Sequence, residues 1–287
     1  MRFNIAMMAG NNFQYLHFLF DTARLIRLAL ESLGHNCCIT RNNLEKDRIN
    51  ILVASHTLTE PGVTKQILDA GVDLMVLQSE VISDGQVNFT GNREHFTNCY
   101  LPLLQNARAV WECVPGQLPI LEQLGVAGHQ FPLGYHPGMN QIAPKRTKDI
   151  DFLFYGSISE HRAKLLRELQ ARGNHVLVLF DAAAIYRNDF IARSRVHLTI
   201  KRELDMHHLP YARICYLIAN GGINVVEECP DQEWLQDCFL SAPTDQWVDL
   251  CEETLQRDDL DSLAETFRQR LHSRDITPAI GSLIEQL

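Results

Sequence analysis

The sequence predicts an α/β protein made of two doubly wound domains, each a parallel sheet with helices on both faces. Short apolar runs of strand length alternate with segments of helical period from one end of the chain to the other, a pattern typical of such sheets. The 287 residues are enough for two domains of average size. Residues 136–149 combine proline, glycine and charge with little core material, so they predict the linker between the domains.

In the first series, apolar runs predict strands and apolar residues repeating every three or four positions predict helices. The predicted strands are residues 3–8, 37–40, 49–54, 72–77, 109–113 and 130–135, and the predicted helices are residues 15–33, 62–70, 95–106 and 119–124. Gly34, Gly71 and Gly125 each follow a predicted helix directly, as glycine does where a helix ends in the left-handed conformation. The polar segment 80–94 is the longest predicted loop, and loops of this length in a compact domain usually either have a function or are disordered.

In the second series the same rules predict another sheet. The predicted strands are residues 151–155, 175–180, 196–200 and 223–226, and the predicted helices are residues 160–170, 184–193 and 210–219. A polar loop, residues 201–208, precedes the last of these helices, and the chain from residue 231 onward is expected to be mostly helical. We therefore predict an N-terminal domain over residues 1–138 and a C-terminal domain over residues 139–287.

Composition excludes several classes of partner. The net charge of −9 predicts no broad basic face for nucleic acid or an anionic membrane surface. No segment approaches the roughly 20 apolar residues of a membrane span, and the N-terminus lacks the features of a secretion signal. The eight cysteines form no CxxC pair, so we expect free thiols in a reducing cytosol, no metal site and a cytoplasmic protein.

In open parallel sheets, ligands bind beyond the carboxyl ends of the strands. In the second series Tyr155 ends the first strand, Gly156 and Ser157 follow it, and Arg162 lies one turn into the next helix. A glycine at this turn lets the backbone approach a ligand, and the helix start favours an anion. The alternative is an ordinary strand–helix turn in which Ser159 caps the helix.

The loop before Pro210 is a second candidate for anion binding. Its free amides and basic side chains would suit a diphosphate; the candidate residues are Lys201, His207, His208, Tyr211 and Arg213. The alternatives are a solvated charged loop and an ion pair for Arg213. Glu227 and Glu228 end the fourth strand and could accept hydrogen bonds from ribose or sugar hydroxyls; alternatively they belong to a charge cluster at a helix start.

General-base chemistry needs a titratable group within reach of a hydroxyl. Residues of this kind near predicted strand ends of the first series are His17, Asp21, Glu80, Glu112 and His136. Each is more often structural when considered alone. Of them, Glu80 and His17 are the preferred candidates for the catalytic base.

Several segments resemble a known family. Residues 149–157, D-I-D-F-L-F-Y-G-S, followed by Arg162, resemble a D-[IV]-D-h-h-h-h-G-S-x-x-x-x-R pattern. Residues 191–200, I-A-R-S-R-V-H-L-T-I, and residues 213–228, beginning R-I-C-Y-L-I-A-N, are similar to further segments of the same group. That group comprises bacterial glycosyltransferases related to the glycosyl transferases group 1 family and the CgeB-like proteins.

The resemblance implies a GT-B architecture of two facing Rossmann-like domains, with the last helices packing back on the N-terminal domain. The donor, a nucleotide-diphosphate sugar, would bind mainly to the C-terminal domain through Lys201, Arg162 and the helix after Pro210. The acceptor would bind on the N-terminal side, where the candidates are Asn11, Asn12, Glu112 and His136. Such enzymes normally need no metal, because helix dipoles and basic side chains stabilise the departing diphosphate.

The resulting prediction is a metal-independent transfer of a sugar from a nucleotide-diphosphate sugar to a hydroxyl- or amine-bearing acceptor such as a glycan, lipid, protein or small molecule. Inverting and retaining chemistry both remain open. One alternative is a non-catalytic GT-B module that binds nucleotide or a partner enzyme. Another is a nucleotide-sugar epimerase on the same architecture.

Overall fold

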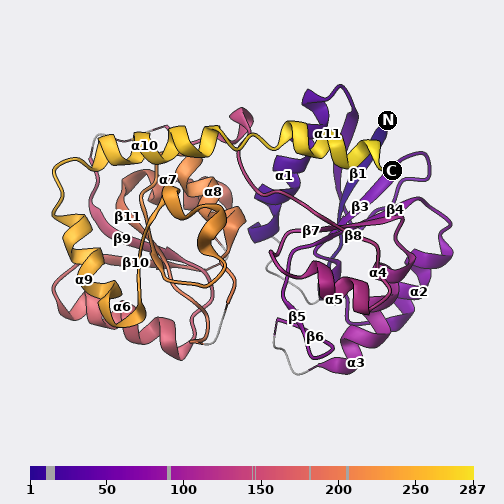
Figure 1. The fold of residues 1–287 in the computed structure, drawn as a ribbon, viewed down its shortest axis with the longest axis horizontal. Helices are drawn as coiled ribbons and strands as arrows, with labels where there is room; N and C mark the ends of the chain where they lie inside the picture. Colours follow the sequence, from indigo (N-terminus) through magenta and orange to yellow (C-terminus); the bar gives the residue numbers. More distant parts are fainter. Residues whose placement is uncertain (11–16, 89–91, 144, 146, 181, 205–206) are drawn as a thin grey trace. The chain divides into compact units, whose positions relative to one another are not determined.

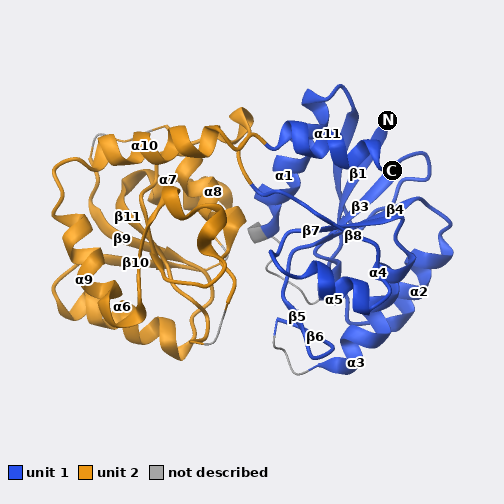
Figure 2. Cartoon of the chain, viewed as in Figure 1, with its two compact units in different colours: residues 1–133, 276–287 blue, residues 134–275 orange. Residues whose placement is uncertain are grey.

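The computed structural model describes residues 1–10, 17–88, 92–143, 145, 147–180, 182–204 and 207–287. They form two compact units, shown in blue and orange in Figure 2. Unit 1 comprises Met1–Leu133 and Ile276–Leu287, and unit 2 comprises Gly134–Asp275. The division thus falls five positions before the domain boundary that the sequence predicts, and the last segment of the chain returns to unit 1.

Unit 1 is built on a six-stranded sheet in the order β2-β1-β3-β4-β7-β8, in which all neighbouring strands are parallel. The strands are β1 (Arg2–Met7), β2 (Asn36–Arg41), β3 (Ile49–Val53), β4 (Leu74–Gln78), β7 (Ala109–Glu112) and β8 (Gly128–Gln130). The first strand lies between the second and third, so the direction of winding reverses between β1 and β3. Such a reversal opens a crevice at the carboxyl ends of the two strands.

The helices of unit 1 are α1 (His17–Ser32), η1 (Ser55–Thr57), α2 (Pro61–Asp69), α3 (Arg93–His95), η2 (Phe96–Tyr100), α4 (Leu101–Asn106), α5 (Leu118–Gln123) and α11 (Thr277–Glu285). The predicted helix 95–106 is divided by the π-helical turn η2, because Pro102 lacks the N–H that a regular α-helix would use there. Helix α11 packs against α1 (Figure 1), and Gly281 lies next to Leu33. The predicted return of the C-terminus to the N-terminal unit is therefore confirmed.

Two predictions for unit 1 are wrong in detail. The strand expected at residues 130–135 is instead β8 at Gly128–Gln130, and the chain beyond Leu133 passes into unit 2. The predicted loop 80–94 contains a small antiparallel hairpin of β5 (Ile82–Ser83) and β6 (Gln86–Val87). Asp84 and Gly85 between these strands both have positive φ, the conformation that a tight two-residue hairpin turn requires.

Unit 2 is built on a five-stranded parallel sheet in the order β10-β9-β11-β12-β13. Its strands are β9 (Ile150–Tyr155), β10 (Val176–Leu179), β11 (Ser194–Thr199), β12 (Asn224–Glu227) and β13 (Leu240–Ala242). Its helices are η3 (Pro137–Met139), α6 (Glu160–Ala171), α7 (Ala184–Arg193), α8 (Tyr211–Ala219), η4 (Gln232–Trp234), η5 (Gln236–Cys238), α9 (Thr244–Leu255) and α10 (Leu260–His272). The sequence did not predict β13. In this sheet the winding reverses between β9 and β11.

The two points at which the chain leaves unit 2 are joined to each other. Tyr135 and Asp275 form a parallel β-bridge, and the Tyr135 N–H donates to the carbonyl of Arg274 over 2.9 Å. The ring of His272 lies 4.0 Å from that of Tyr135, centroid to centroid. The first and last residues of unit 2 are thus held side by side.

All eight cysteines are free thiols. Among the described residues, no helix has both the length and the apolar character needed to cross a membrane.

Candidate functional site

The winding reversal of unit 2 brings together most of the donor-site residues that the sequence predicts. Gly156 follows β9 directly, and Ser159 caps α6 by accepting a hydrogen bond from the Arg162 N–H at 3.2 Å. Lys201 follows the adjacent strand β11 after a single residue. The β9–α6 turn and the end of β11 therefore lie at the winding reversal, the position at which open parallel sheets usually bind ligands.

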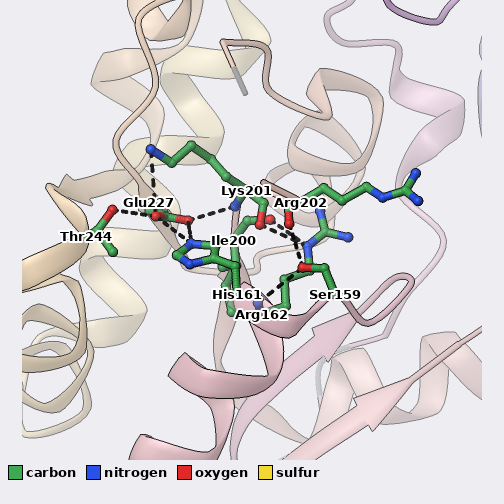
Figure 3. Close-up of polar contacts among 8 residues, drawn as sticks. All are labelled: Ser159, His161, Arg162, Ile200, Lys201, Arg202, Glu227 and Thr244. Atoms are coloured by element: carbon green, nitrogen blue, oxygen red, sulfur yellow. Dashed lines mark hydrogen bonds and ion pairs between the residues drawn. The ribbon is translucent and has the colours of Figure 1, made fainter. Parts of the chain in front are cut away.

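Arg162 ties these two chain segments together. The residue is only 7% exposed, and its Nε donates to the carbonyls of Ile200 and Lys201 at 3.0 and 3.2 Å. Its Nη1 donates to the carbonyl of Ser157 at 2.9 Å, and Figure 3 shows the side chain among these carbonyl-bearing segments. The sequence predicts Arg162 as a phosphate ligand; in the structure its Nε and Nη1 bind oxygens of the chain and hold these two segments together.

Glu227 at the end of β12 is the centre of a second set of contacts (Figure 3). It is fully buried and accepts from His161 Nε2 at 2.9 Å, from Thr244 Oγ1 at 2.6 Å and from the Lys201 N–H at 2.9 Å. The Lys201 ammonium lies 3.7 Å from the same carboxylate. Both oxygens of Glu227 are thus occupied, so this residue orients Lys201, whereas its neighbour Glu228 is exposed.

Arg213 in the first turn of α8 faces the β9–α6 turn. A Cβ at Gly156 would lie 3.3 Å from Arg213 Nη2, so the close approach requires glycine. The guanidinium lies 5.0 Å from the ring centroid of Tyr155. Within the described chain, Arg213 Nη1 is buried without a hydrogen-bond partner. A buried donor left unpaired is costly, and an anion that reached this atom would supply the missing acceptor.

The surroundings of Arg213 are strongly basic. Arg187 of α7 is 5% exposed and lies 5.8 Å from the same Tyr155 ring. Burial and the Arg187 charge lower the pKa of Arg213. Burial, together with the charges of Arg213 and Arg202, lowers the pKa of Arg162 to about 9. Like charges held this close in a desolvated site favour the binding of an anion.

Near the start of α8, two of the predicted anion-binding residues, His208 and Tyr211, contact the acidic residue Asp231. The Asp231 carboxylate accepts from the Leu209 N–H at 3.3 Å and lies 3.2 Å from His208 Nδ1. The backbone carbonyl of Asp231 accepts from the Tyr211 hydroxyl. His207 is exposed. A carboxylate at the start of α8 disfavours a second anion there. The positive side chains lie instead on the Gly156 side of the helix.

In unit 1, the candidate base Glu80 follows β4. Its carboxylate accepts from Ser79 Oγ at 3.2 Å and from Asn88 Nδ2 at 2.5 Å, and His56 Nε2 lies 3.7 Å from Oε1. The Gln78 amide donates to the Glu80 carbonyl at 2.5 Å. The Glu80 side chain is 16% exposed, so a fixed carboxylate is within reach of solvent at the carboxyl end of the sheet.

Glu112 ends the neighbouring strand β7, opposite Gln78 in the register. It is fully buried; its Oε1 accepts from the Val114 N–H at 2.7 Å, and its Oε2 has no hydrogen-bond partner among the described residues. Burial and the charge of Glu80 raise the pKa of Glu112 to about 8. Glu112, an acceptor-side candidate in the sequence, is thus a buried carboxylate inside unit 1.

In the unchanged protein, the free energy of unfolding is expected to fall as the pH rises from 4.5 to about 8. In Glu112→Gln this fall is expected to disappear. The folded protein keeps the Glu112 proton up to a pKa of about 8, against an ordinary value of 4.5. The folded state therefore binds more protons in this window, and its stability falls as the pH rises through it. Each unit of pKa difference corresponds to at most about 1.4 kcal/mol. Urea unfolding across this pH range measures the effect.

Glu94→Gln is the matched control, because Glu94 is an exposed carboxylate of the same unit. Tyr100 and Cys113, which also contribute to this cluster, have pKa values raised well above their ordinary values by burial, so they do not titrate in this range. An unchanged slope of stability against pH in Glu112→Gln would show that Glu112 is ionised in the folded protein.

The remaining catalytic and acceptor-side candidates either belong to the other unit or lie outside the residues that the structure describes. Asn11 and Asn12 are outside the described residues, and His17 is the first residue of α1, with a side chain that is also outside them. His136 belongs to unit 2, where its Nδ1 accepts from the Gly138 N–H at 3.0 Å. His136 is therefore not part of the unit that contains Glu80 and Glu112.

Sequence reasoning missed four residues of these clusters: His56, His161, Arg187 and Thr244. Their positions at the start of a helix or directly after a strand are a weak signal. Only the folded chain shows that His161 and Thr244 meet one carboxylate and that His56 faces another.

Comparison with known proteins identifies the fold. No family model matches the chain, and no curated protein matches it in sequence. Among solved structures, T4 phage BGT in complex with UDP-glucose superposes with a TM-score of 0.65 and 13% identity, covering 100% of this chain and 99% of that one. AviGT4, a glycosyltransferase involved in avilamycin A biosynthesis, has a TM-score of 0.57 and 13% identity, covering 99% and 96%.

An α-glucosyltransferase in complex with UDP and a 13-mer DNA has a TM-score of 0.62 at 10% identity, covering 96% of each chain. These likenesses, together with the two parallel sheets, confirm the prediction of a GT-B-type fold with two Rossmann-like domains. The narrower resemblance to the CgeB-like family stays a prediction.

Proposed function

We propose that the chain is a glycosyltransferase that takes a sugar from a nucleoside-diphosphate sugar and transfers it to a hydroxyl-bearing acceptor. Unit 2 holds the donor and unit 1 supplies the base. The proposal rests above all on Arg213, a cation whose Nη1 is buried without a partner among the described residues, beside the backbone of Gly156. A diphosphate oxygen is the ligand whose charge and hydrogen-bonding capacity match that position.

In this proposal the diphosphate binds between the Gly156 turn and Arg213, and the Lys201 ammonium adds a second positive charge. The bond between the sugar C1 and the diphosphate oxygen breaks as the acceptor oxygen forms a new bond to C1. The electron pair leaves with the diphosphate, where fixed cations stabilise the growing charge. The proton of the acceptor hydroxyl passes to the Glu80 carboxylate, which acts as general base.

The exposed carboxylate Glu228, at the end of β12, is the better placed of the two adjacent glutamates for a ribose hydroxyl pair, because Glu227 is already occupied. Support for a nucleoside-diphosphate donor also comes from the fold, since T4 phage BGT was solved with UDP-glucose. That protein was also solved with UDP and Mn²⁺, so metal dependence needs a direct test. We propose that Arg213 and Lys201 make a metal unnecessary here.

Thermal unfolding in the presence of UDP, GDP, ADP and dTDP tests the donor site. At a concentration of about 100 times Kd, one of these nucleotides is expected to stabilise the protein by about 2.7 kcal/mol, equally in EDTA and in Mn²⁺. Stabilisation that appears only with Mn²⁺ would refute metal independence. No stabilisation by any nucleotide would refute the donor site.

Turnover separates the proposal from its alternatives. A transferase is expected to release nucleoside diphosphate from the matching nucleotide sugar while the sugar is transferred to water or to an added acceptor. Binding without release would favour a non-catalytic module. Conversion of one nucleotide sugar into another without acceptor would favour an epimerase.

A further inference from the structure

Unit 1 contains a hollow at the carboxyl ends of its first strands. It encloses about 320 Å³ and lies beyond β1, β2 and β3, where the winding of the sheet reverses. Its lining includes Ala9 and Gly10 after β1, Asn42 after β2, and Leu58 and Thr59 after η1. This volume is at the lower end of the range for small-molecule sites, enough for one ring-sized group.

The walls of the hollow are rigidly held. Asn42 has a positive φ of 49°, and its side chain accepts from the Ala9 N–H at 2.9 Å and donates to the Ala9 carbonyl at 3.1 Å. Gly10 lies against the segment after β3, since a Cβ there would be 3.3 Å from the Thr57 carbonyl oxygen. The hollow is thus formed before a ligand arrives, as small-molecule sites usually are.

The chemistry of the lining is apolar at the base and polar at the rim. Met8, Leu58 and Ile67 are buried members of the hydrophobic core. The rim contains amide and hydroxyl side chains, namely Asn42, Asn43, Thr59 and Gln66, all of them exposed. Among the described residues that line the hollow, Glu60 is the only charged one and none is basic.

We propose that this hollow binds a neutral, ring-sized hydroxylated group of the acceptor, such as a sugar ring or its aglycone. A sugar ring has an apolar face for the base of the hollow and hydroxyls for its rim. A phosphate-bearing acceptor would meet Glu60 without a compensating cation from the described lining residues, and the chain as a whole carries a net charge of −9. The assignment rests on the proposed function only in naming the ligand as the acceptor.

The test uses 4-nitrophenyl β-glucoside, a neutral glycoside, titrated into the 287-residue protein with ¹³C-labelled methionine, leucine and isoleucine methyls. We expect saturable shifts of the Met8, Leu58 and Ile67 methyls. Gln66→Trp, which places an indole over the rim, is expected to weaken binding at least tenfold. Lys65→Trp is the matched control on the same helix, because Lys65 is exposed and does not line the hollow.

The inference is overturned if the three methyls do not respond, if Gln66→Trp binds the glycoside as well as Lys65→Trp does, or if a short duplex DNA produces the same methyl shifts in place of the glycoside. UDP binding measured on both variants keeps the outcomes apart. Nucleotide binding without a response in the hollow would leave the transferase proposal intact and refute this site. A response in the hollow without nucleotide binding would refute the transferase and leave a glycoside-binding site.

Discussion

Replacing Arg213 with methionine is expected to lower the affinity for the stabilising nucleoside diphosphate about 100-fold, or by roughly 2.7 kcal/mol, without destabilising the unliganded protein. The Arg213 guanidinium beside Gly156 has a hydrogen-bond donor, Nη1, without a partner among the described residues. Truncating one side of a buried charged contact typically costs a few kcal/mol of binding free energy. Isothermal titration calorimetry measures the affinity, and urea unfolding without ligand measures the stability.

The second half of this expectation is the more discriminating. In the unliganded protein Arg213 is expected to destabilise the folded state, because its Nη1 is buried without a partner among the described residues and the positive charge of Arg187 lies nearby. Methionine fills similar space without a charge, so unfolding is expected at equal or higher urea concentration. Arg167→Met is the control, an exposed arginine of α6. If Arg213→Met unfolds much more easily and still binds nucleotide, Arg213 is structural.

Glu80→Gln is expected to reduce turnover of the donor by a factor of roughly 10² to 10⁴, the usual contribution of a general base, while nucleotide affinity stays unchanged. The amide keeps the shape of the carboxylate but cannot accept the acceptor's proton. Release of nucleoside diphosphate under saturating donor measures the rate, and calorimetry measures binding to unit 2.

Glu94→Gln is again the matched control, since Glu94 is an exposed carboxylate of α3 in the same unit as Glu80. Normal turnover in Glu80→Gln would remove this residue from the mechanism and leave the base to be sought elsewhere in unit 1. A fall in nucleotide affinity would instead mean that Glu80 contributes to donor binding.

The strand–helix alternation was sufficient to predict both sheets, because parallel strands buried on two faces have continuous apolar sequences. The errors have local causes. Residues 131–135 are apolar enough for a strand, but the chain there leaves the sheet of unit 1 after β8. Strand β13 has only three residues, Leu240–Ala242, too few for a periodic pattern.

The candidate site was predictable to the level of strand ends and no further. Gly156, Lys201 and Arg213 could be chosen because the sheet topology places the loops after β9 and β11 together. Which cation remains available depends on burial and on partners from distant segments. Arg162 binds three carbonyls of its own chain, and Glu227 is occupied by His161 and Thr244. Such competition for hydrogen bonds is not encoded in local sequence.

The packing of α11 on α1 also bears on the order in which the protein can fold as it is synthesised. Unit 2 is one uninterrupted stretch, Gly134–Asp275, so all of its residues are present before the ribosome reaches Ile276. Unit 1 is synthesised first, but it is incomplete until its last helix, α11, has been translated. The surface of α1 beside Leu33 stays uncovered until Gly281 has left the ribosome. Since domains tend to fold as they are completed during translation, the unit that starts second is expected to finish first.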